Sequence, residues 1–275
     1  MLISIEHITR YTLAEPASYT IQCLRLTPPS FEAQQVTSWS VEMPQIEDAV
    51  RFRDCYGNIA QLVAISEPHS EIEIAARGVV ETRDRAGVAR GVVDIAPHRV
   101  YLRDTPRTMP DEAIKDLAES VASDDTIERM HKLMDEIHRR VDYVIGATHA
   151  HTSASEALSE GQGVCQDHAH IFISAARLMG IPARYVNGYF VTDSDEPSEA
   201  HHAWAEVWID GIGWIGFDPA NEVCPTERYV RLACGLDAAA AAPIRGTRRG
   251  GSDEVLDVTV EVQQQSAQQQ QQQQS

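Results

Sequence analysis

The chain has 275 residues, of which 43% are hydrophobic, and this is enough for two domains with a sizeable buried core. Its 41 acidic residues outnumber 23 basic ones, giving a formal charge of -18. This charge disfavours nucleic acid and anionic membranes as partners.

Residues 1–90 alternate polar and apolar positions in short β-rich runs, and proline-containing breaks separate these runs. We therefore predict an N-terminal antiparallel β-sandwich of about seven strands. The runs are LISIEHITRY, YTIQCLRL, VTSWSVEM, IAQLVAIS and EIEIAARGVVET.

A helical period replaces this alternation after Pro110. DEAIKDLAESVA favours one helix, and apolar residues at helical spacing from Ile127 to Val141 indicate a second. Ser153 followed by Glu156 has capping-box spacing and predicts the start of a third helix, with Gly161 available to end it. These helices open a second domain, residues 91–250.

The segment GQGVCQDHAHIFISAARLMGIPARY predicts a buried helix that starts at Cys165 and stops at Gly180 and Pro182. The runs ARYVNGYFVT, HHAWAEVWI and GWIGFDP then favour strands, the last two joined as a hairpin by DGIG. Helices followed by antiparallel strands make this domain α+β. A returning strand at residues 251–262 could join either domain, and the glutamine-rich tail, residues 263–275, is predicted to be disordered.

The start of the chain, MLISIEHITRYTLAEP, has none of the features of a secretory signal. No apolar run approaches the roughly 18 residues of a membrane span. The five cysteines are scattered and include no CxxC pair, which is typical of a reducing compartment. We therefore expect a soluble cytoplasmic protein without a membrane partner.

Cys165 has the position of an activated nucleophile. A helix N-terminus lowers the pKa of a thiol placed there, and a neighbouring imidazolium lowers it further. Gly161 and Gly163 allow a tight approach of the backbone, and the first free N–H groups of the helix could form an oxyanion site.

His202 and Asp218 are the candidate base and orienting acid. They lie on the two strands of the predicted hairpin, at equal distances from a centre near Asp210. This register would make them cross-strand neighbours. Adjacent His201 competes with His202, but strand alternation sends the two side chains to opposite faces.

The blocks GQGVCQDHAHIFISAARLMGIPARYVNGY, HAWAEVW and GWIGFDP resemble the bacterial transglutaminase-like superfamily, whose members share a papain-like core. The N-terminal strands resemble the β-rich domain that precedes that core in these bacterial proteins, and only the glutamine tail lies outside the resemblance. It implies a cysteine nucleophile at Cys165, a base at His202 and an orienting acid at Asp218. One departure is His168, where similar sequences usually have an aromatic residue.

Four further residues are candidates for substrate or oxyanion support: Gly163, Gln166, Asp167 and Trp204. Asp167 would also suit the helix dipole without any role in binding, and Trp204 would also suit the core. Glu206 lies on the same strand face as His202, where it could pair with Arg184.

A metal site is the alternative explanation of the histidines, because imidazoles and a thiol can bind zinc. Their spacing matches no ligand signature such as HExxH or CxxC, and no DxDxDG calcium loop occurs. We therefore expect no metal, no cofactor and no need for calcium. The histidines concerned are His149, His151, His168, His170, His201 and His202.

These features predict a thiol-dependent acyl-transfer enzyme, a cysteine peptidase or amidase that hydrolyses a peptide or isopeptide bond. The same three residues would also serve amine transfer, as in a protein-glutamine gamma-glutamyltransferase. A non-catalytic binding module and a metal-dependent hydrolase remain alternatives. The partner is a peptide or protein substrate, and the acidic loop at residues 192–200 hints at cationic groups; the sequence does not indicate the oligomeric state.

Overall fold

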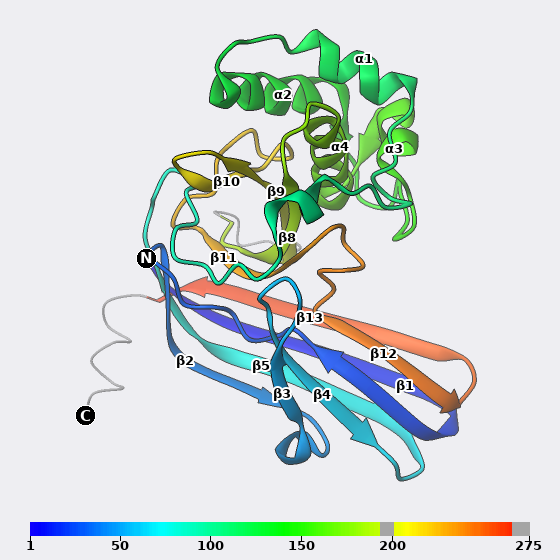
Figure 1. Cartoon of the computed structure of the whole chain (residues 1–275). Helices are drawn as coiled ribbons and strands as arrows, with labels where there is room; N and C mark the ends of the chain where they lie inside the picture. Colours follow the sequence, from blue (N-terminus) through cyan, green and yellow to red (C-terminus); the bar gives the residue numbers. More distant parts are fainter. Residues whose placement is uncertain (193–200, 266–275) are drawn as a thin grey trace.

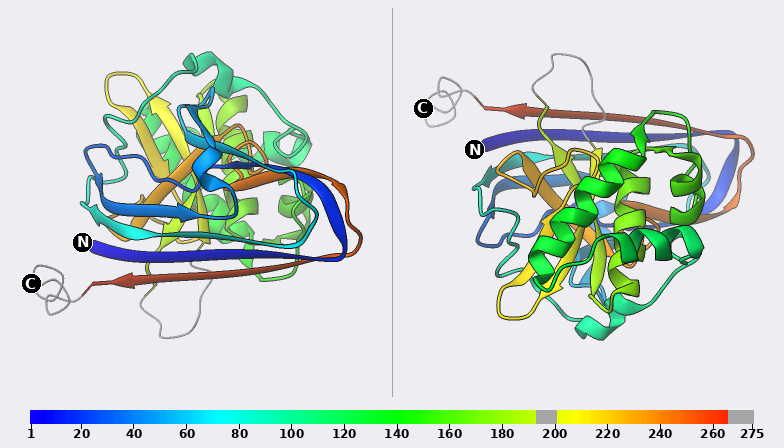
Figure 2. Two further views of the ribbon diagram at one scale, coloured as in Figure 1. Left: turned by 90° about the horizontal axis from the view of Figure 1, so that it is seen from below. Right: turned by 90° about the horizontal axis from the view of Figure 1, so that it is seen from above.

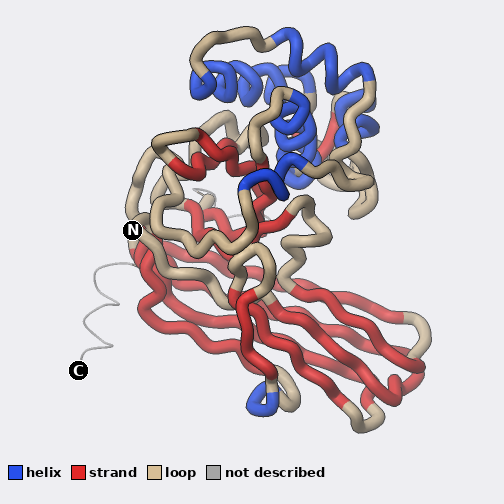
Figure 3. Tube along the Cα trace, viewed as in Figure 1, coloured by secondary structure: helices blue, strands red, loops and turns tan. Residues whose placement is uncertain are grey.

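The computed structural model describes residues 1–192 and 201–265. Figure 1 shows a long β-sheet below a part that combines helices with a smaller sheet. Figure 3 shows that the longer helices gather at the end of the molecule farthest from the long sheet, while a short helical turn lies against that sheet. The predicted α+β class, with an antiparallel N-terminal sheet followed by a papain-like core, is confirmed.

The N-terminal sheet has seven strands, all antiparallel to their neighbours, in the order β2-β5-β1-β4-β3, with β12 and β13 also paired to β1. A short 3-10 helix, η1, lies between β2 and β3. The bounds are β1 Leu2–Leu24, β2 Gln34–Glu42, η1 Ile46–Asp48, β3 Val50–Arg53, β4 Ile59–Ile65, β5 His69–Thr82, β12 Ile244–Gly250 and β13 Glu254–Gln264.

Strand β1 is a single long strand, whereas its two halves were predicted as separate strands. Its first half pairs with β5 and β13, and its second half pairs with β4 and β12. The ladder with β5 is interrupted between Thr12 and Ala17, around Pro16, because proline has no N–H to donate. The interruption lets the sheet bend without ending the strand.

The bent sheet encloses a core to which both halves of β1 contribute, including Ile3 from the first half and Leu24 from the second. This core extends into the second domain through Tyr189, Val230 and Leu232. These residues lie on or beside β8 (Ala183–Phe190) and β11 (Tyr229–Gly235). The N-terminal sheet therefore packs directly on the sheet of the second domain.

The returning C-terminal segment is longer than predicted and joins the N-terminal sheet. It begins with β12 at Ile244, inside the predicted 91–250 domain, and β13 continues to Gln264, inside the predicted 263–275 tail. Gln263 and Gln264 pair with the backbone of Ser4 and Ile3, and such a ladder does not depend on apolar side chains. Figure 2 shows β13 beside β1 along one edge of the sheet. The rest of the predicted tail, residues 266–275, lies outside the described residues.

Four helices follow a linker that contains the short 3-10 helix η2 (His98–Leu102). The third of these helices starts with the predicted capping box: the Ser153 side chain accepts from Glu156 N, and the Glu156 carboxylate accepts from Ser153 N. Gly161 ends the third helix with φ of 66°, a conformation that glycine adopts at no steric cost. The bounds are α1 Glu112–Ser120, α2 Thr126–Arg140, α3 Ala154–Glu160 and α4 Cys165–Leu178.

Helix α4 is the centre of the second domain. It packs against the other helices and against a four-stranded sheet of order β10-β9-β8-β11, in which β9 is His201–Ile209 and β10 is Gly213–Phe217. Phe172 of α4 stacks on Phe217, with ring centroids 5.4 Å apart. No helix within the described residues is both long enough and apolar enough to cross a membrane.

Candidate active site

Cys165 is the first residue of α4, and its side chain is 8% exposed. The chain reaches it through β7 (Gln162–Gly163), which pairs in parallel with β6 (Asp142–Tyr143). A Cβ atom on Gly163 would lie 2.7 Å from Cβ of Asp167, a contact too close to tolerate. Glycine is therefore needed for close packing just before the cysteine, as the sequence predicts.

Asp167 anchors the start of α4. Its Oδ2 accepts hydrogen bonds from Val164 N at 2.9 Å and from Thr148 Oγ1 at 2.6 Å. The carboxylate therefore faces the backbone before Cys165 and the loop after β6. The structure gives Asp167 a structural contact rather than the pocket position considered from the sequence.

The first turn of α4 offers two backbone donors beside the thiol. The N–H groups of Asp167 and His168 both donate to Val164 O, at 3.0 and 3.2 Å. Within the described ranges, the N–H groups of Cys165 and Gln166 have no acceptor. Two free donors at a helix N-terminus suit a developing oxyanion, and the half-buried Gln166 contributes its backbone to this arrangement.

His202 and Asp218 form a direct hydrogen bond, as predicted. His202 Nε2 lies 2.6 Å from Asp218 Oδ2, and both side chains are buried. The predicted register was wrong by two residues: Phe217 pairs with Ala205, so the hairpin is centred on Gly211 rather than Asp210. A shift of two preserves the strand face, and the two side chains meet as diagonal neighbours.

The shift follows from the turn. Ile212 N donates to Ile209 O at 3.1 Å, and Gly211 and Gly213 have positive φ values of 83° and 109°. Three residues therefore connect the strands. The predicted DGIG turn is present, but its length decides which residues face each other.

Two residues that the sequence did not suggest also bind the Asp218 carboxylate. Tyr229 Oη donates to Oδ2 at 2.7 Å, and Asn221 Nδ2 donates to the same oxygen at 2.8 Å. Ala220 N donates to Oδ1 at 3.1 Å. Burial raises the pKa of Asp218, but the charge of His202 and the hydrogen bonds from His202, Tyr229 and Asn221 outweigh it and leave the pKa below its usual value.

The His202 imidazole is held in its charged form. Burial lowers the pKa of His202, but the charge and hydrogen bond of Asp218, followed by contact with the Cys165 side chain, raise it to about 10. Since Nε2 faces Asp218, Nδ1 is the ring nitrogen left for Cys165. The three side chains thus converge, with an imidazolium between a carboxylate and a thiol.

Trp204 lies behind the base rather than on a substrate surface. It is 2% exposed, its ring stacks along His202 with centroids 6.4 Å apart, and it meets Tyr229 edge to face at 5.5 Å. The predicted substrate contact therefore does not fit, because almost no surface of the indole is free. Its place is to fix the orientation of His202 and Tyr229 through packing.

His201 points away from this site, as strand alternation predicts. Its ring centroid lies 6.0 Å from that of His7 in β1 and 6.3 Å from that of Tyr189. Burial, with smaller effects from His7 and His202, lowers the pKa of His201 to about 4. His201 is therefore a neutral residue of the domain interface.

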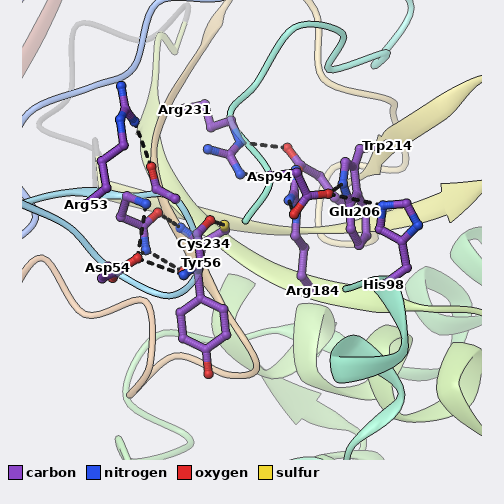
Figure 4. Close-up of polar contacts among 12 residues, drawn as sticks. Arg53, Asp54, Tyr56, Asp94, His98, Arg184, Glu206, Trp214, Arg231 and Cys234 are labelled. Atoms are coloured by element: carbon purple, nitrogen blue, oxygen red, sulfur yellow. Dashed lines mark hydrogen bonds and ion pairs between the residues drawn. The ribbon is translucent and has the colours of Figure 1, made fainter. Parts of the chain in front are cut away.

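A buried ion network occupies the face of the sheet away from α4. Arg184 Nε donates to Glu206 Oε2 at 2.6 Å, and Arg231 Nε donates to Glu206 Oε1 at 3.0 Å (Figure 4). The Arg184 guanidinium lies 3.8 Å from the ring centroid of Trp214, whose Nε1 donates to Asp94 in the linker. The predicted pairing of Glu206 with Arg184 is confirmed, and the network ties the linker to the sheet.

The remaining histidines of the motif have structural contacts. His168 places its two ring nitrogens 2.9 Å from Val164 O and 3.0 Å from Val141 O, joining α4 to the end of α2. His170 Nε2 accepts from Ala238 N at 3.1 Å. In residues 1–192 and 201–265, no three His, Cys, Asp or Glu side chains converge as metal ligands. Residues 193–200, most of the acidic loop considered for specificity, lie outside the described residues.

Comparison with known proteins agrees with this arrangement. Residues 115–219 match the transglutaminase-like superfamily, and residues 3–81 match the bacterial transglutaminase-like N-terminal region. An uncharacterized protein of Mycobacterium leprae is 30% identical over 272 residues, covering 94% of this chain and 97% of the relative. A protein-glutamine gamma-glutamyltransferase of Pseudomonas aeruginosa is 34% identical over 86 residues, 29% of this chain and 12% of that protein.

Among solved structures, a candidate cysteine protease from Cytophaga hutchinsonii superposes with a TM-score of 0.71 at 24% identity. The superposition covers 94% of this chain and 90% of that one. It supports the shared fold over both the N-terminal sheet and the second domain.

Proposed function

The chain belongs to the transglutaminase-like superfamily, and on that premise we propose that it is a cysteine peptidase or amidase. Its substrate is a peptide or protein, in which it hydrolyses a peptide or isopeptide bond. One observation carries the proposal: the His202 imidazole lies between Cys165 at the start of α4 and Asp218, 2.6 Å away.

Acylation uses the thiolate and imidazolium forms of this pair. The Cys165 sulfur attacks the amide carbonyl carbon, and the carbonyl π electrons move to oxygen, next to the free N–H groups of Cys165 and Gln166. The intermediate collapses as His202 gives its proton to the amide nitrogen. The C–N bond breaks, the amine leaves, and a thioester remains on Cys165.

Deacylation reverses these roles. His202, now neutral, takes a proton from water, and the resulting hydroxide attacks the thioester carbonyl. The C–S bond breaks, the carboxylic acid product leaves, and the thiolate and imidazolium pair is restored. Asp218 keeps its charge throughout and holds the ring in one orientation.

Amine transfer is the second candidate function, favoured by the similarity to the Pseudomonas aeruginosa gamma-glutamyltransferase over part of this chain. In that reaction a primary amine attacks the thioester in place of water, and an amide is formed. The residues needed are the same, so the acceptor that reaches the thioester decides the outcome.

A peptide-library assay with and without a fluorescent primary amine tests both functions. We expect cleavage products in each case, and fluorescent peptides if the amine is also accepted. Cys165→Ala abolishes both products, whereas Cys55→Ala, which removes an exposed thiol of the N-terminal domain, leaves them unchanged. Full activity in Cys165→Ala, or activity removed by a chelator alone, would contradict the proposal and favour a metal-dependent hydrolase.

A non-catalytic module would behave differently. Its Cys165 would not react with iodoacetamide at neutral pH, and no library peptide would be changed. We expect rapid labelling instead, because the adjacent imidazolium stabilises the thiolate that reacts.

A further inference from the structure

Three consecutive large apolar residues are exposed at the end of the short strand β6 and directly after it. Tyr143, Val144 and Ile145 are 45%, 37% and 68% exposed. Within the described ranges, no other run of three large apolar residues is exposed throughout. Val144 and Ile145 belong to none of the hydrophobic clusters of the described residues, whereas the ring centroid of Tyr143 lies 6.1 Å from that of His168. Packing within the described residues therefore does not account for the exposure of Val144 and Ile145.

The segment is fixed to the backbone that carries the nucleophile. Tyr143 pairs with Gly163 in the β6 and β7 ladder, and Val144 N donates to Gly163 O at 2.9 Å. Farther along the loop, Thr148 Oγ1 donates to Asp167 Oδ2 at 2.6 Å. The apolar run is thus held on both sides by residues that flank Cys165.

This attachment limits the distance between the run and the backbone of Cys165. Paired strands lie about 5 Å apart and consecutive Cα atoms about 3.8 Å apart. Gly163 lies two positions before Cys165. The backbone of Val144 is therefore within roughly 12 Å of that of Cys165, a distance that about three or four residues of an extended substrate peptide span.

We propose that Val144 and Ile145 form an apolar subsite that takes an apolar side chain of the acyl-donor peptide. Exposed apolar side chains held in place next to a reactive centre are typical of a binding surface. Covering them with an apolar substrate group removes both partners from water, whereas a charged group would gain nothing there. This subsite rests on the proposed function, since it presumes that Cys165 attacks a peptide carbonyl.

Two electrophiles with the same reactive group test the subsite without a known substrate. Iodoacetamide is small and polar, and its N-benzyl derivative adds an apolar ring. Alkylation of the Cys165 peptide is followed by mass spectrometry. The rate with the N-benzyl derivative is divided by the rate with iodoacetamide, and this ratio is then divided by the same ratio measured for glutathione. For the unmodified chain we expect a corrected ratio well above one.

Substitution at the subsite should lower this ratio. Ile145→Ser is expected to reduce it about threefold to tenfold, and Val144→Ser by a smaller factor. Ile95→Ser is the matched control, because Ile95 is 52% exposed in the linker, next to the Asp94 that binds Trp214 on the other face of the sheet. It should leave the ratio unchanged.

The outcomes separate the subsite from the proposed function. A corrected ratio near one in the unmodified chain, or a ratio unaffected by both Ser substitutions, overturns the subsite while rapid alkylation of Cys165 leaves the proposed function standing. Slow alkylation by both reagents overturns the proposed function itself. All three substituted side chains are exposed to solvent, so we expect the three variants to fold, as circular dichroism would verify.

Discussion

Replacing Asp218 with Asn should remove the charge that keeps His202 protonated. The pKa of His202 is raised from 6.5 to about 10, against the effect of burial. At about 1.4 kcal/mol per pKa unit, this difference corresponds to roughly 5 kcal/mol in favour of the imidazolium. Without the carboxylate, burial is opposed only by the smaller effect of the Cys165 side chain, so the fraction of protonated ring at pH 6 to 7 should fall.

Loss of the imidazolium should appear as slower alkylation of Cys165 at low pH. An ordinary thiol has less than about 1% of its molecules as thiolate at pH 6. The rate with iodoacetamide at pH 6 should therefore fall in Asp218→Asn, because a neutral ring no longer offers a positive charge to the thiolate.

Mass spectrometry of the digested protein measures this rate and contains its own control. Cys55 is exposed, and burial of its sulfur together with the charge of Asp54 raises its pKa. Its labelling should increase with pH in both proteins to the same extent. If Cys165 in Asp218→Asn is labelled at pH 6 as quickly as in the unmodified chain, Asp218 does not maintain the imidazolium and the reasoning fails.

Four further outcomes are expected. Tyr229→Phe removes one donor to the orienting carboxylate, so kcat should fall about threefold to tenfold with KM unchanged; an unchanged kcat would argue against a positioning role. Gly163→Ala brings a Cβ to 2.7 Å from that of Asp167, and calorimetry should show a loss of about 1–3 kcal/mol in unfolding free energy. Burial lowers the pKa of His7 and His201 to about 4 from 6.5, so their stabilisation is complete above pH 6.5 and is lost as the pH falls toward 4. The midpoint of urea unfolding should therefore fall as the pH is lowered from 6.5 to 4, and it should fall less steeply in His7→Gln than in the unmodified chain. An equally steep fall in both proteins would contradict this. EGTA should leave activity unchanged, and loss of activity that calcium restores would refute calcium independence.

The helices could be predicted closely because their signals are local. The Ser153 and Glu156 pair and the glycine at residue 161 lie within the helix that they delimit, so no distant contact was needed to place its ends. Cys165 could likewise be placed at the start of α4 from the glycines before it and the apolar run after it.

The sheet partners could not be predicted in this way, because strand alternation does not specify which strand lies alongside. The sequence does not specify which domain the returning segment joins. In the structure this segment, from Ile244 onward, pairs with β1 of the N-terminal sheet. In the hairpin, the strands were predicted correctly but their register was not, since a turn of three residues moves the centre to Gly211.

In the candidate site, too, residues with a local sequence signal could be predicted, and residues that depend on strand pairing could not. Cys165, His202 and Asp218 stand out by residue type and by the blocks that contain them, and the structure brings them together. Tyr229 could not have been found from spacing, because it reaches Asp218 from β11 only after the sheet has formed. Asn221 had a weak local signal, since an amide three residues after Asp218 in a turn can return to that carboxylate.

Trapping the acyl-enzyme tests the central claim most directly. The protein is mixed with a library peptide that it has been found to cleave, and the reaction is quenched in acid within the first turnover. The mass of the Cys165 peptide is then measured by mass spectrometry. The account predicts a mass increase equal to the acyl portion of the substrate, located on Cys165 and removed by hydroxylamine, as expected of a thioester. Product formation without this adduct, continuing in Cys165→Ala, would contradict it.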